Sequence, residues 1–110
     1  MAHLSTHVLD TSRGKPAAGV KIELFHEGKL AHATVTNQDG RTDTPFPLVA
    51  VGVYEFIFHA GAYFREVGTL LSEPPFLDEI VIRFGVADPH GRYHVPLLLS
   101  PYGYSTYRGS

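Results

Sequence analysis

The sequence predicts an all-β fold, an antiparallel β-sandwich of seven to eight strands with one short helix at about residues 60–71. Short segments alternate apolar and polar residues, a period of two that is typical of strands with one buried face. Turn-forming residues separate these segments at short intervals, as they do in sandwiches. Only one segment carries apolar residues at helical spacing, so a single helix is expected among the strands.

The expected strands are joined by short connections rich in Gly, Pro, Asn and Asp. The helix carries apolar residues through Leu71 and is expected to stop at residues 72–75, which contain two prolines. Residues 88–91, Asp-Pro-His-Gly, predict a hairpin turn between the strands on either side. The expected strands cover residues 3–9, 20–26, 30–36, 53–59, 77–84, 92–100 and 103–107.

The composition limits the classes of function. The chain has 110 residues, of which 44% are hydrophobic and 18% charged, and we expect one domain over residues 1–110. The net charge is -2 and the nine Lys and Arg residues do not cluster, which argues against nucleic-acid or membrane-surface partners. No apolar run approaches the ~20 residues of a spanning helix, and no signal peptide is expected. The chain has no cysteine, so it forms no disulfide and fits a cytoplasmic location.

Two of the seven histidines stand out by their position on a strand. A histidine chosen without regard to position is most often a solvated or hydrogen-bonded structural residue. His7 lies mid-strand on the face opposite Leu4 and Val8, and His94 lies on the face opposite Leu97. The strand that carries His94 is largely apolar on both faces, so we expect another subunit to cover its outer face.

A metal site and a covalent mechanism are both poorly supported by the sequence. His3 and His7, like His90 and His94, are four residues apart, which on a strand is roughly 13 Å at about 3.3 Å per residue. Neither pair can chelate one ion, so no metal and no cofactor is expected. There is no Gly-x-Ser-x-Gly motif, but a Ser–His–Asp triad assembles only in space and stays open. Neutral histidines that act on water also remain available.

Arg41 and the C-terminal segment each allow two interpretations. Arg41 follows the turn Asn-Gln-Asp-Gly at residues 37–40. It is either a solvated arginine at the start of a strand or a planar donor fork for a carbonyl or an anionic heterocycle. Residues 104–110 are aromatic and β-prone almost to the last position, whereas most terminal segments fray. This segment is therefore either docked on the fold or cut short.

Three blocks of sequence resemble the transthyretin-like family. They are Leu-Ser-Thr-His-Val-Leu-Asp at residues 4–10, Thr-Asn-Gln-Asp-Gly-Arg at 36–41, and Tyr-His-Val-Pro-Leu-Leu-Leu-Ser-Pro at 93–101, which continues into Tyr-Ser-Thr-Tyr-Arg-Gly-Ser at 104–110. The resemblance covers the whole chain. The family has a branch of thyroid-hormone carriers and a branch of hydrolases, and the terminal Tyr-Arg-Gly-Ser is similar to the hydrolase signature. Where the carriers have lysine, threonine and threonine, this chain has His7, His94 and Tyr107.

The resemblance implies a transthyretin-like sandwich that forms a homotetramer, a dimer of dimers with its sites at the dimer–dimer interface. It implies hydrolysis of 5-hydroxyisourate to 2-oxo-4-hydroxy-4-carboxy-5-ureidoimidazoline in urate degradation, by direct attack of water on the cyclic amide. The sequence leaves open which histidine is the general base. The alternatives are a carrier of a small aromatic ligand and a structural or adhesive sandwich. The implied catalytic residues are His7, Arg41 and His94, and the implied substrate-binding residues are Tyr107, Arg108, Gly109 and Ser110.

Overall fold

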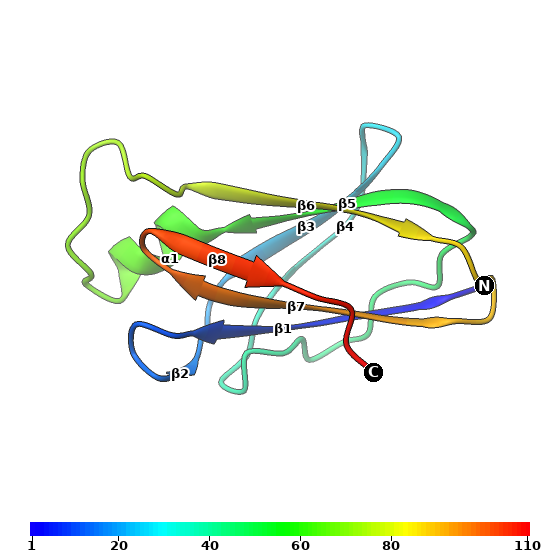
Figure 1. Cartoon of the computed structure of the whole chain (residues 1–110), viewed down its shortest axis with the longest axis horizontal. Coiled ribbons are helices and arrows are strands. Elements are labelled where there is room, and N and C mark those ends of the chain that lie inside the picture. The colour runs from blue at the N-terminus through cyan, green and yellow to red at the C-terminus, as the bar shows by residue number, and fades with distance from the viewer.

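Two four-stranded β-sheets pack face to face, and one short helix lies at one end of the sandwich (Figure 1). The computed structural model describes every residue, 1–110. The first sheet has the strand order β2-β1-β7-β8 and the second has the order β4-β3-β5-β6. The predicted β-sandwich with one short helix is confirmed. The elements are β1 (His3–Asp10), β2 (Lys15–Pro16), β3 (Lys21–His26), β4 (Lys29–Val35), β5 (Gly52–His59), α1 (Ala60–Glu66), β6 (Glu79–Val86), β7 (Arg92–Ser100) and β8 (Gly103–Thr106).

One strand pair departs from the predicted antiparallel arrangement. β1 and β7 are parallel, whereas all other neighbouring strands are antiparallel. Parallel neighbours need a long crossover between them. Here the whole second sheet and the helix separate the two strands along the chain. The pairing therefore joins an early strand to a late strand in the middle of the first sheet (Figure 1).

The core lies between the sheets and consists of side chains from alternate strand positions. Val8 in β1 and both Leu97 and Leu99 in β7 are fully buried, as the alternation predicted. Each fully buried side chain of this size contributes about 1.5–3 kcal/mol relative to its exposed state. Because successive side chains point to opposite faces of a strand, the residues between these buried ones lie on the outer side of the sheet. His7 and His94 are among them and lie away from the core.

A buried carboxylate ties the end of β1 to the helix. Asp10 is fully buried, and its Oδ2 accepts a hydrogen bond from the hydroxyl of Tyr63 on α1 at 2.7 Å. Its Oδ1 accepts hydrogen bonds from the backbone N–H groups of Ser12 and Arg13. Burial, and next the hydrogen bond to Asp10, raise the pKa of Tyr63, so its hydroxyl remains the donor. Because the buried carboxylate has these partners, it is accommodated without an orphaned charge.

The helix is shorter than the sequence predicted. α1 spans Ala60–Glu66 rather than residues 60–71, because Gly68 adopts a φ of +82°, a left-handed conformation that ends helices. The N–H of Gly68 bonds back into the last turn. Leu70, which the helical spacing placed on an apolar face, is 95% exposed. The chain contains no helix with the length and apolar character needed to cross a membrane.

Residues 88–91 form a turn, but this turn does not close a hairpin. β6 belongs to the second sheet and β7 to the first, so the predicted hairpin is wrong and the turn is a corner between the sheets. The hydroxyl of Tyr93 holds the corner by accepting hydrogen bonds from the N–H groups of Ala87 at 3.0 Å and Asp88 at 2.8 Å. The local sequence encodes a reversal of the chain but not the sheet that the next strand joins.

Candidate active site

The outer face of the first sheet carries the two histidines that the sequence singled out. His7 on β1 and His94 on β7 are both half-buried and lie on neighbouring parallel strands. Ser5 is the residue directly opposite His94 across this strand pair. Its hydroxyl oxygen lies 2.7 Å from Nδ1 of the His94 ring. The parallel register therefore places a hydroxyl, and not a second histidine, against His94.

The turn that follows β4 brings Arg41 to the same region. The side-chain oxygen of Asn37 closes the turn by accepting a hydrogen bond from the Arg41 N–H. Gly40 has a φ of +73°, and its carbonyl accepts a hydrogen bond from the Val8 N–H at 2.8 Å. A side chain at position 40 would collide with the carbonyl oxygen of Val8 and contact the His7 ring. Glycine is thus needed here both for the turn and for its close approach to β1.

Arg41 and His94 share a cavity of about 460 Å³. The C-terminal segment closes one side of it, because the N–H of Gly109 donates a hydrogen bond to the carbonyl of His94 at 2.8 Å. A Cβ atom on Gly109 would lie 2.5 Å from Cδ2 of His94, so a glycine lets this segment pack on the ring. The cavity is lined by His3, Leu4, Ser5, Arg41, Pro45, Arg92, His94 and Ser110.

Burial and positive charge favour the neutral form of the His94 imidazole. The pKa of His94 lies below its ordinary value, first because partial burial disfavours the charged ring and then because of the positive charges of Arg41 and His7. Its Nε2 makes no hydrogen bond within the chain and is not buried. A neutral imidazole with an accessible nitrogen can take a proton from water near pH 7. No group of three or more His, Asp or Glu side chains is arranged to hold a metal ion.

The structure brings four of the predicted site residues close together. Arg41, His94 and Ser110 line the same cavity, and Gly109 packs on the His94 ring. His7 lies next to the turn that carries Arg41, at the border of this group rather than in the lining of the cavity. The arrangement places a neutral imidazole, a guanidinium and the hydroxyls of Ser5 and Ser110 around a space that a small polar ring can enter.

Tyr107 and Arg108 face a different part of the molecule. They line a second cavity, of about 360 Å³, between β6 and the C-terminal segment. The guanidinium of Arg108 lies 4.1 Å from the centre of the Tyr93 ring and donates a hydrogen bond to the Arg92 carbonyl at 3.2 Å. The Tyr107 side chain is 57% exposed. Within one chain these two residues are therefore not part of the cavity around His94.

Sequence reasoning missed the roles of Ser5 and Gly40. The alternation of β1 placed Ser5 on the same face as His7. Its contact with His94 depends on a parallel pairing between residues 89 positions apart, and no local pattern encodes that pairing. Gly40 was recognised as a turn residue. Its close packing on β1 depends on where the turn docks, which is also a non-local property.

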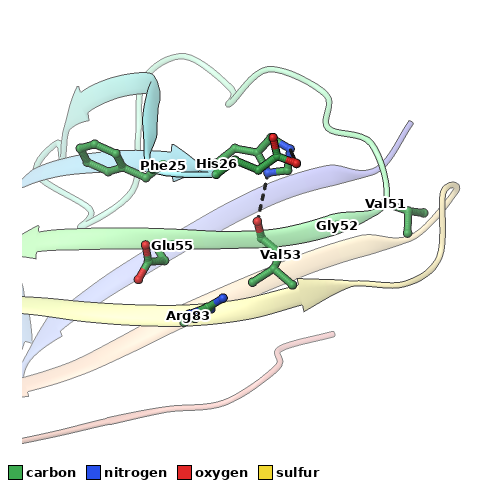
Figure 2. A pocket seen from close by; sticks show the side chains of 9 residues that line it. Phe25, His26, Val51, Gly52, Val53, Glu55 and Arg83 are labelled. Atoms are coloured by element: carbon green, nitrogen blue, oxygen red, sulfur yellow. Dashed lines mark hydrogen bonds and ion pairs between the residues drawn. The ribbon is translucent and has the colours of Figure 1, made fainter.

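The largest cavity lies elsewhere, on the second sheet near the turn between β3 and β4 (Figure 2). It measures about 500 Å³ and contains none of the predicted site residues. Its histidine, His26, donates a hydrogen bond from Nδ1 to the Val53 carbonyl at 3.0 Å, drawn as a dashed line in Figure 2. The His26 ring also stacks on Tyr54, with ring centres 4.3 Å apart. A histidine held in this way supports the strand pair, so the candidate site is the cavity around His94.

The fold and this cavity define a member of a known family. The model of the HIUase/Transthyretin family matches residues 4–109, so the chain belongs to that family and the resemblance seen in the sequence is confirmed. The chain is 57% identical to 5-hydroxyisourate hydrolase 2 of Rhizobium meliloti, over 97% of this chain and 95% of that protein. It matches the structure of Klebsiella pneumoniae 5-hydroxyisourate hydrolase with a TM-score of 0.88 and 37% identity over 100% of both chains. Sea bream transthyretin in complex with thyroxine matches with a TM-score of 0.82 and 28% identity, over 96% of this chain and 93% of that one.

Proposed function

We propose that this chain is a hydrolase that converts 5-hydroxyisourate to 2-oxo-4-hydroxy-4-carboxy-5-ureidoimidazoline, a ring-opening step of urate degradation. The observation that carries the proposal is the neutral His94, with an accessible Nε2, beside Arg41 in one cavity. The Rhizobium and Klebsiella relatives, which match over nearly their full length, are 5-hydroxyisourate hydrolases by name. A cytoplasmic location is part of the proposal and fits the absence of cysteine.

Arg41 would bind the substrate and stabilise charge. A guanidinium presents a planar fork of N–H donors, which suits the carbonyl and ring-nitrogen edge of a bicyclic heterocycle. As water adds to the amide carbon, the carbonyl oxygen gains negative charge. A fixed positive donor beside that oxygen stabilises the transition state more than the ground state. The turn docked through Gly40 would hold Arg41 in place for this role.

The proposed reaction is direct attack of water, without a covalent intermediate on the protein. Nε2 of His94 takes a proton while the water oxygen bonds to the carbonyl carbon of the cyclic amide. The tetrahedral intermediate then collapses, the C–N bond of the ring breaks, and the leaving nitrogen receives a proton from an imidazolium. His7 and His94 would share these two transfers. The oxygen and one hydrogen of the water thereby enter the new carboxyl group, and the other hydrogen ends on the released nitrogen.

The chain would assemble as a homotetramer, a dimer of dimers, with sites where the dimers meet. Apolar side chains on the outer side of the first sheet support this assembly, including the half-buried Leu9 and Leu98. Such a surface is expected to be covered by another copy in a symmetric oligomer. Light scattering at micromolar concentration should give the mass of four chains. A stable monomer with full activity would contradict this part of the proposal.

The remaining predicted residues would act in the assembled protein. Tyr107 and Arg108 line the second cavity of their own chain. Their proposed role is therefore to complete a pocket at the interface between subunits, where Tyr107 would narrow the space to fit a small bicyclic ring. Gly109 and Ser110 already lie at His94 and would contact the substrate there.

The decisive assay follows the near-ultraviolet absorbance of freshly prepared 5-hydroxyisourate. We expect the absorbance to fall much faster with the protein than in buffer, and we expect the His94→Asn variant to lose most of this acceleration. A carrier of small aromatic ligands would slow the spontaneous decay or leave it unchanged. A structural or adhesive module would also leave it unchanged. Either of these results would overturn the proposed activity.

A further inference from the structure

The contact between Ser5 and His94 gives the imidazole ring a defined orientation. The Ser5 hydroxyl lies 2.7 Å from Nδ1, on one edge of the ring. The opposite edge, at Cδ2, packs against Gly109. Half a turn of the ring about its Cβ–Cγ bond would exchange Nδ1 with Cδ2 and Nε2 with Cε1. That rotation would place a carbon against the hydroxyl, so the Ser5 contact opposes it.

The same contact bears on the position of the ring proton. A serine hydroxyl can donate to a bare Nδ1 or accept from a protonated Nδ1. The Ser5 hydroxyl makes no other hydrogen bond within the chain, so it can take either role. The other nitrogen, Nε2, is accessible, and the positively charged Arg41 lines the same cavity. A cation favours an unprotonated nitrogen nearby over an N–H group, and this favours the proton on Nδ1.

We propose that Ser5 is a positioning residue that accepts a hydrogen bond from Nδ1–H of His94 and thereby holds the Nε2 lone pair toward the cavity. The inference rests on the proposed hydrolase function and assigns the base role to Nε2 of His94. Ser5 does not touch the reacting atoms in this scheme. It acts through His94, as an outer hydrogen-bond partner acts on a metal-bound or catalytic histidine.

Kinetics provide the first test. In Ser5→Ala we expect kcat to fall about tenfold, as for loss of one hydrogen bond of roughly 1.4 kcal/mol, with KM changed less than about twofold. Ser5→Thr keeps the hydroxyl and suits an exposed strand position, so it should restore most of kcat. The matched control is Ser72→Ala, which removes an exposed hydroxyl that bonds only to the Pro74 carbonyl and should leave both parameters unchanged. An unchanged kcat, or a change confined to KM, would overturn the positioning role.

The ¹⁵N resonances of the imidazole provide a second test that needs no substrate. In the wild-type protein we expect His94 to carry its proton on Nδ1 and to show an unprotonated Nε2. In Ser5→Ala we expect a shift toward the Nε2–H tautomer that histidine prefers in water. A wild-type ring protonated on Nε2 would overturn the inference, as would a tautomer that is unchanged by Ser5→Ala. Because this measurement is independent of turnover, it separates failure of the Ser5 inference from failure of the proposed activity.

Discussion

The outer faces of the two sheets both carry histidines, but the neighbours of these histidines differ. On the second sheet, Nε2 of His59 lies 2.5 Å from a carboxylate oxygen of Glu23, and its Nδ1 lies 3.9 Å from Glu79. On the first sheet, His94 contacts the hydroxyl of Ser5, and Arg41 supplies positive charge nearby. One histidine is thus surrounded by acidic groups and the other by a hydroxyl and a cation.

The difference shows that the side chains on neighbouring strands, rather than strand phase, separate a histidine held by carboxylates from one with an unpaired ring nitrogen. His59 and His94 both lie on the outer face of a strand and both are half-buried. The carboxylates around His59 come from the strands on either side, so the cluster ties β3, β5 and β6 together. His94 instead keeps one ring nitrogen without a partner in the chain. An unpaired, accessible nitrogen is the feature that acid–base chemistry requires.

Replacing the histidines of the first sheet should have the largest effect. We expect His7→Asn and His94→Asn each to lower kcat/KM by at least about 10²-fold, the lower end of the range for a positioned general base. The matched change on the second sheet, His59→Asn, should leave kcat/KM within about twofold while it lowers the melting temperature through loss of the cross-strand contacts. Steady-state rates and thermal melts of the three variants measure the contrast.

The double variant of His7 and His94 sharpens this prediction. If the two rings act on one water, the double variant should be only slightly slower than the slower single variant, since groups that act as a unit are not additive. Multiplicative losses would assign them to separate steps. Either of two results would contradict the proposed difference between the sheets. One is a single variant, His7→Asn or His94→Asn, that remains active with its fold and assembly intact. The other is a His59→Asn variant that lowers kcat/KM as much as His94→Asn does.

Arg41 should show a smaller but clear effect. We expect Arg41→Lys to lower kcat/KM by about tenfold or more, because a lysine supplies the charge but not the planar fork, and about 1.4 kcal/mol corresponds to each factor of ten. Arg65→Lys is the matched control, since Arg65 lies on α1, lines none of the three cavities and pairs with Glu73 at 3.7 Å, so it should tolerate the change. Activity of Arg41→Lys within about twofold of wild type would return Arg41 to the role of a solvated turn residue.

The smallest effect should be on stability at acidic pH. The pKa of His94 is lowered from its ordinary 6.5 in the folded protein, so between the two values the unfolded chain binds more protons than the folded chain. Stability therefore falls as the pH drops from above 6.5 toward the folded pKa. Between about one pH unit above and one below 6.5, the melting temperature of His94→Asn should fall less than that of the wild type. An equal fall in the melting temperatures of both proteins would show that protonation of His94 does not lower stability in this pH range.

Much of the fold follows from local patterns in the sequence. The alternation predicted the bounds of β7 at residues 92–100 and the buried faces of β1 and β7, because a buried face leaves a period of two. The helix end was wrong because the apolar spacing continues to Leu71 although Gly68 already ends the helix. The two-residue β2, within a segment assigned to turns, is too short to leave a pattern.

The sequence predicted part of the candidate site as one chain shows it, and the differences within one chain have a common cause. Arg41, His94 and Ser110 do line one cavity. The resemblance grouped Tyr107 with them, but within one chain this residue lines the cavity on the other side of the C-terminal segment. Contacts of this kind are decided by which strands pair and where loops dock. Those choices depend on the packing of the whole chain and leave no signal in any short stretch of residues.

The parallel pairing of β1 with β7 has a consequence for how the chain folds during its synthesis. Ser5 and His94 are separated by 89 positions, so their contact has a very high contact order. A nascent chain on the ribosome exposes β1 long before β7 emerges, and during that time β1 lacks its central partner in the sheet. Closure of so long a loop comes late in folding because its entropy must be lost before the contact forms. If His94 acts as proposed, an incomplete chain would have no activity, and hydrolysis would begin only after synthesis has released the strand that carries His94.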